Sequence, residues 1–108
     1  MKVKNLADSE LFNAIALPQG DREIDGVYAC DLLSWVMGRA KCDNAWITIM
    51  SNINILAVAS LSDVSCIILA EGVTVEQEVI DTALDKEINI LSTDMNIYNT
   101  AVYLNEII

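Results

Sequence analysis

The chain has 108 residues, 54% of them hydrophobic, and its 16 acidic against 6 basic side chains leave a formal net charge of −10. This length suits one compact domain with its own core, and the acidic field repels phosphate backbones, which excludes general nucleic-acid binding. There is no histidine, and Cys30, Cys42 and Cys66 lack a C-x-x-C spacing, so we expect neither histidine catalysis nor a zinc site or disulfide framework.

The first half of the chain predicts two helices with two strands between them. A turn at 18–21, Pro-Gln-Gly-Asp, separates the two strands. Asp31 has the chemistry of a helix N-cap, and Gly38 that of a helix terminator. The predicted elements are a helix at 3–9, strands at 11–17 and 26–30, and a helix at 31–38.

The second half alternates short apolar runs with helical periodicity. The runs are continuously apolar and rich in isoleucine, which is typical of parallel strands buried on both faces. Thr74 with Gln77 resembles a capping box, and Thr93 or Asp94 is suited to cap the last helix. The predicted elements are strands at 45–50, 66–70 and 88–91, and helices at 52–63, 74–87 and 94–108.

This alternation predicts one α/β layered domain over residues 1–108, with a mainly parallel central sheet and flanking helices. The N-terminal residues are too polar for a signal peptide, and no apolar run reaches the roughly 18 to 20 residues that span a bilayer. We therefore expect a soluble protein of a reducing cytoplasm, with no membrane contact.

Catalytic motifs are missing from the sequence. There is no G-x-x-x-x-G-K-[ST] loop, no G-x-G-x-x-G fingerprint and no G-x-S-x-G elbow. We therefore expect no enzyme activity, no cofactor and no bound metal.

Ligand binding is better supported, because open α/β sheets bind ligands beyond the carboxyl ends of their strands. The loops that follow the last three strands carry hydroxyls and amides suited to phosphate or ribose, and a glycine that allows close backbone approach. Helix capping is the alternative role of the polar residues. The candidate ligand residues in these loops are Ser51, Asn52, Gly72, Thr74, Ser92 and Thr93.

Arg22 is a further candidate, because its planar guanidinium suits a carboxylate or phosphate. It lies between Asp21 and Asp25, so an internal ion pair that fixes the loop is the alternative. Gly26 indicates a turn or a close backbone approach before the next strand.

The short helix at 31–38 is apolar on several sides. We expect Leu33, Trp35 and Met37 to form part of an interface with another chain, because so short a helix cannot bury every face. Core packing of Trp35 is the alternative.

Several blocks occur in the order DREIDGVYACDLLSWVMGRA, AWITI, NILAVA, CIILAEG and INILST. Together they resemble the stand-alone DRTGG-domain proteins of anaerobic bacteria, and are similar to the N-terminal domain of HPr kinase/phosphorylases. The resemblance extends from Val3 to Ile108. The acid–arginine–glycine motif that names the family is not intact here, and the phosphate-binding loop of the kinases has no counterpart. The resemblance therefore implies the domain without the kinase.

The resemblance also implies an accessory role. Such domains occur beside CBS nucleotide-sensing domains in regulated pyrophosphatases, and stand-alone members tend to be encoded near redox or signalling proteins, which suggests a partner of that kind. We therefore expect a non-catalytic regulatory module that binds a small anionic ligand, such as a nucleotide or phosphate, and acts through a homodimer or a partner contact. A pure protein-interaction module without a small-molecule ligand is the alternative.

Overall fold

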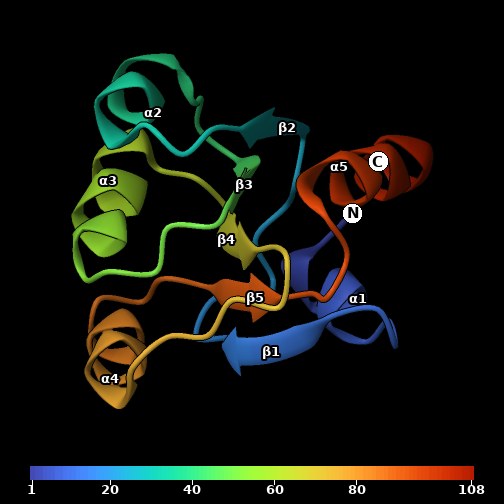
Figure 1. The fold of residues 1–108 in the computed structure, drawn as a ribbon. Helices are drawn as coiled ribbons and strands as arrows, with labels where there is room; N and C mark the ends of the chain where they lie inside the picture. The colour runs from blue at the N-terminus through green and yellow to red at the C-terminus, as the bar shows by residue number, and fades with distance from the viewer.

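A computed structural model describes residues 1–108 (Figure 1). Its elements follow the predicted order, helix, strand, strand and then alternating helices and strands, so this prediction is confirmed. None of its helices has the length and apolarity needed to cross a membrane. The elements are α1 Val3–Ala7, β1 Asn13–Ala16, β2 Gly26–Ala29, α2 Leu33–Arg39, β3 Asn44–Thr48, α3 Asn54–Ser62, β4 Cys66–Leu69, α4 Gln77–Asp85, β5 Ile90–Ser92 and α5 Ile97–Ile107.

The five strands form one sheet in the order β1-β5-β4-β3-β2. β2, β3, β4 and β5 run parallel, and β1 joins the edge antiparallel to β5. The predicted class, a layered α/β domain with a mainly parallel sheet, is therefore confirmed. The turn at 18–21 does not make a hairpin, since β1 and β2 occupy opposite edges of the sheet.

Helices cover both faces of the sheet, with α2, α3 and α4 on one side and α1 and α5 on the other (Figure 1). Because side chains alternate along a strand, Trp46 on β3 and Ile67 on β4 pack under the first group of helices. Their neighbours Ile47 and Ile68 pack under the second group. This two-sided burial explains why the strands read as continuous apolar runs.

Gly26 begins β2, where its backbone lies close to β3. A Cβ at this position would lie 2.9 Å from Nδ2 of Asn44. Gly26 therefore lies in the strand rather than in a turn, and the close approach at this position is that of the Asn44 side chain.

The predicted ends of α2 are wrong. The helix begins at Leu33 after an N-cap at Leu32, and Gly38 lies inside it. Asp31 does not cap the helix, because its carboxylate accepts hydrogen bonds from the Thr48 hydroxyl at 2.8 Å and the Ile49 N–H at 2.9 Å. Asp31 therefore joins the carboxyl ends of β2 and β3.

The predicted starts of α4 and α5 are also shifted. The N-cap of α4 is Glu76, with no side-chain cap bond, so Thr74 and Gln77 do not form a capping box. The N-cap of α5 is Asn96, whose side chain accepts from the Asn99 N–H, in place of Thr93 or Asp94. The loops beyond β4 and β5 are therefore longer than the sequence pattern indicates.

Candidate functional site at the carboxyl edge of the sheet

Five of the predicted ligand residues line two adjoining hollows beyond the carboxyl ends of the parallel strands. The first hollow, about 500 Å³, lies between the start of α3 and the start of α4, and Ser51, Asn52 and Thr74 line it. The second, about 320 Å³, is lined by Gly72, Thr74 and Ser92 among others. Thr74 lines both hollows, so the two together make up the candidate site.

The loops after β4 and β5 hold each other in place. Gly72 has a φ of +68°, which favours glycine, and its N–H donates to the Thr93 carbonyl at 2.9 Å. Glu71 donates from its N–H to the Met95 carbonyl at 2.8 Å. These bonds give the second hollow a rigid floor, and a Cβ at Gly72 would lie only 3.2 Å from Oδ1 of Asp94.

The predicted polar residues divide into structural and free side chains. Asn52 accepts a hydrogen bond from the Asn54 N–H at 2.9 Å, which is a local turn at the start of α3. Thr93 is buried, its hydroxyl accepts from the Met95 N–H at 3.2 Å, and it lines neither hollow. The hydroxyls of Ser51, Thr74 and Ser92 form no hydrogen bond within the protein, so they are the ones available to a ligand.

The charge around the two hollows is acidic. Glu76 and Glu78 line the first and Asp94 lines the second, while no lysine or arginine lines either. No group of three or more cysteine, aspartate or glutamate side chains is arranged to hold a metal ion. A phosphorylated ligand would therefore meet negative charge here unless it brings its own counter-ion.

Arg22 lies at the opposite, amino edge of the sheet and cannot join this site. Its guanidinium donates to the Asp43 carboxylate at 2.8 Å, and to the Asp63 carboxylate at 3.0 Å and carbonyl at 2.9 Å. Partial burial opposes its charge, but the hydrogen bonds to Asp43 and Asp63 outweigh that effect and raise the pKa of Arg22. The expected partners Asp21 and Asp25 are not the ones used, since Asp21 pairs with Lys4 at 2.9 Å.

Residues missed by the sequence reasoning complete the second hollow. Asn13 comes from β1, which reaches the carboxyl end of β5 because β1 runs antiparallel to it. Nothing local in the sequence indicates this position. The sequence predicts Asp94 only as a helix cap, although its place directly after a strand is a signal for a site residue.

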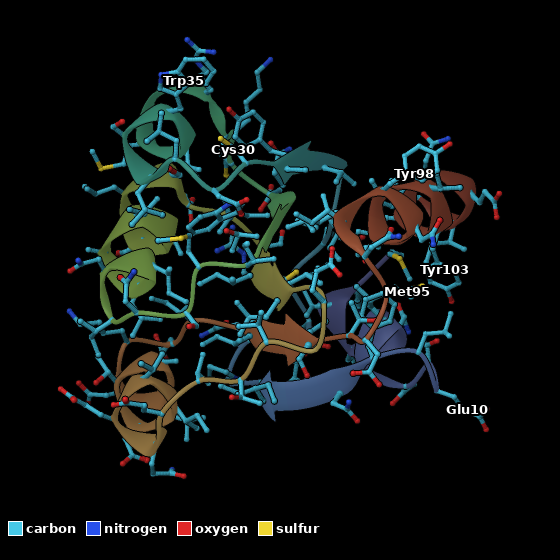
Figure 2. All side chains as sticks on the ribbon, viewed as in Figure 1. Glu10, Cys30, Trp35, Met95, Tyr98 and Tyr103 are labelled. Carbon is cyan, nitrogen blue, oxygen red and sulfur yellow. The ribbon has the colours of Figure 1, made fainter.

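The helix α2 presents apolar side chains to solvent. Trp35 and Met37 are each 49% exposed, and Trp35 points away from the fold (Figure 2). The Arg39 guanidinium lies 3.7 Å from the centre of the Trp35 ring. Leu33 is partly buried against the core, so it supports this surface from below rather than forming it.

An open, mostly parallel sheet between two helical layers, with two hollows of mixed polar and apolar lining at its carboxyl edge, defines a small three-layer α/β domain. Residues 27–107 match the family model of the DRTGG domain, and the chain therefore belongs to the DRTGG domain family. No curated protein matches the sequence.

A solved structure has the same fold: the CBS and DRTGG domains of the regulatory region of Clostridium perfringens pyrophosphatase, complexed with its activator, diadenosine tetraphosphate. The two share 19% sequence identity at a TM-score of 0.71, over 95% of this chain and 45% of the other. The likeness shows the fold, and the chain spans less than half of that protein's length. The similarity expected with HPr kinase/phosphorylase stays a prediction.

Proposed function

We propose that this chain is a non-catalytic regulatory domain that binds a nucleotide at the carboxyl edge of its sheet. One observation carries the proposal: Ser51, Thr74 and Ser92, whose hydroxyls have no partner within the protein, line two adjoining hollows at the edge where open α/β sheets bind ligands. Membership of the DRTGG family, and the nucleotide activator of the pyrophosphatase that has the same fold, support a nucleotide as the ligand class.

The lining suggests how the ligand is recognised. The hydroxyls, and the Asn52 NH2 group that the local turn leaves unused, suit the ribose and the base. The carboxylates of Glu76 and Asp94 oppose bare phosphate. A nucleotide would therefore enter this site as its Mg²⁺ complex, whose cation would offset the negative charge of Glu76 and Asp94. Nucleotide binding then favours the one of two conformations of the domain that binds the nucleotide more tightly, and so changes its contact with a second copy or with a partner protein.

Thermal unfolding in the presence of AMP, ATP or diadenosine tetraphosphate, with and without Mg²⁺, tests this proposal. A nucleotide at about 100 times its Kd adds roughly 2.7 kcal/mol of stability, which raises the Tm of a small domain by several degrees. We expect this shift only with Mg²⁺. Thr74→Ala and Ser92→Ala should each reduce it, because each removes a hydroxyl from the hollows.

Ser60→Ala is the matched control, since Ser60 is exposed and lies toward the amino edge of the sheet. An equal loss of the shift in this control would show that the ligand does not bind at the carboxyl edge. The absence of a shift with every nucleotide would refute nucleotide binding.

The exposure of Trp35 and Met37 favours a second candidate function, a protein-interaction module without a small-molecule ligand. Under this second function α2 would contact either a second copy of the chain or a redox or signalling protein. A half-exposed tryptophan is an anchor typical of such interfaces.

A further inference from the structure

The two edges of the sheet differ in how they are protected. Edge strands expose free N–H and C=O groups, and proteins usually protect them with charges, prolines or bulges. The β1 edge has an irregular register between Ala14 and Ala16, and Pro18 follows it. The other edge, Gly26–Ala29, contains no charge, proline or bulge. This difference indicates that the β2 edge is kept free for pairing.

The free groups of β2 belong to Val27 and Ala29. The Cys30 N–H donates to the Ile47 carbonyl on β3 at 3.2 Å. Because bonding direction alternates along a strand, Gly26 and Tyr28 also face β3, and the N–H and C=O groups of Val27 and Ala29 face outward. The N-terminal residues cover this edge only up to Ile24, whose N–H donates to the Met1 carbonyl at 2.8 Å.

A groove of about 500 Å³ runs between this open edge and α5. β2 and α5 are neighbours in the fold (Figure 1). The middle of the groove is lined by small or apolar residues, and Asp25 and Asn105 add polar side chains. A strand edge beside a helix can bind an extended peptide, since the edge supplies main-chain hydrogen bonds and the groove accepts alternate side chains. The residues that line the groove are Asp25, Gly26, Val27, Ala29, Ala101, Asn105 and Ile108.

Charge decides which partner this edge suits. Asp25 precedes β2 and Asp31 follows it closely, no lysine or arginine lines the groove, and the whole chain carries −10. A second copy paired antiparallel about Tyr28 would place Asp25 opposite Asp31 of the other copy, which is repulsive. A basic segment is attracted at both ends.

We propose that the β2–α5 groove binds an extended segment of a partner protein, apolar in the middle and flanked by lysine or arginine, as an additional strand. This surface is separate from the two ligand hollows, so the inference does not depend on nucleotide binding.

The test uses the ¹⁵N-labelled chain and a synthetic peptide in which valine and threonine alternate between terminal lysine pairs. We expect the amide signals of Val27 and Ala29, and those of α5 near Ala101, to shift on titration. The same peptide with glutamate in place of lysine should bind at least about tenfold more weakly. Shifts elsewhere, equal binding of both peptides, or no shifts at millimolar peptide would overturn the proposal.

Two variants locate the interaction. Ala29→Pro removes an outward N–H and leaves the ladder to β3 intact, so it should weaken binding about tenfold, whereas Ala29→Ser keeps that N–H and should bind as the parent does. Asp25→Lys reverses the charge at one end without altering β2, and should shift the preference toward the glutamate peptide even if the proline variant does not fold. A concentration-dependent shift of these amides without peptide, with a dimer in sedimentation, would instead assign the groove to a second copy.

Discussion

At the scale of single residues, Arg22 shows how one side chain organises the amino edge of the sheet. Its guanidinium binds Asp43 before β3 and Asp63 before β4, and so joins the entrances of two strands. Asp63 is in the left-handed region at a φ of 54°, where it ends α3. A hydrogen bond from the Cys42 thiol and the charge of Arg22 hold the pKa of the Asp63 carboxyl below its ordinary value.

Arg22→Gln should lower the free energy of unfolding by about 1–2 kcal/mol at pH 7, because it removes three hydrogen bonds in a partly exposed network. The lowered pKa of Asp63 means that this stabilisation is present above about pH 4 and is lost as the pH falls through the native pKa. Urea unfolding at pH 7 and pH 3 should therefore show a smaller difference at pH 3.

Lys41→Gln is the control for net charge, since Lys41 is exposed and forms none of the ion pairs of the structure. The explanation fails if the Arg22 variant loses the same stability at both pH values, or if the control loses as much.

At the scale of elements, the two tryptophans have different roles: Trp46 on a strand belongs to the core, and Trp35 on a helix lies at the surface. Trp46 on β3 is fully buried, and its Nε1–H donates to the Cys30 carbonyl at 2.9 Å. Trp35 on α2 is half exposed, while Val36 beside it is fully buried. Val36 therefore attaches α2 to the core, whereas about half of the Trp35 side chain faces solvent.

Trp35→Glu should lower the free energy of unfolding by only about 1 kcal/mol, because half of the side chain already faces solvent and the main loss is its contact with Arg39. Trp46→Ala should cost about 3–5 kcal/mol. Sedimentation of the Trp35 variant then tests the α2 interface, because a charge at its centre should dissociate any homodimer of the parent chain. A large loss of stability in the Trp35 variant would show that this side chain belongs to the core.

At the scale of the whole molecule, Cys66 reports whether the domain unfolds as one unit. It lies at the start of the central strand β4, fully buried, and burial raises the pKa of its thiol to about 12. Unfolding restores an ordinary thiol pKa of about 8.5. The protonated Cys66 thiol therefore contributes its full share to the free energy of unfolding below about pH 8.5, and that share is lost as the pH rises toward 12.

Alkylation at pH 8 should therefore modify the exposed Cys42 in the folded protein, slowly because the hydrogen bond to Asp63 raises the pKa of its thiol. Cys66 should be modified only after global unfolding. Mass spectrometry across a urea titration should give the same midpoint for Cys66 labelling as circular dichroism gives for unfolding. Labelling of Cys66 well before that midpoint would show that the sheet opens locally.

The sequence by itself determined the class of fold and the order of the elements. The strands are continuously apolar because helices cover both faces of the sheet, so runs such as 66–70 could be recognised without a structure. The carboxyl-edge residues Ser51, Thr74 and Ser92 could also be named, since the loops after parallel strands meet at one edge.

Only the tertiary structure decided the remaining points, because they depend on contacts between residues far apart in the chain. The pairing of β1 with β5 brings Asn13 to the site, and no local pattern encodes that pairing. Arg22 forms ion pairs with Asp43 and Asp63 rather than with its sequence neighbours, because the N-terminal ends of β3 and β4 lie beside it in space. Local periodicity determines which residues are buried, whereas the long-range pairing of strands decides which polar groups meet.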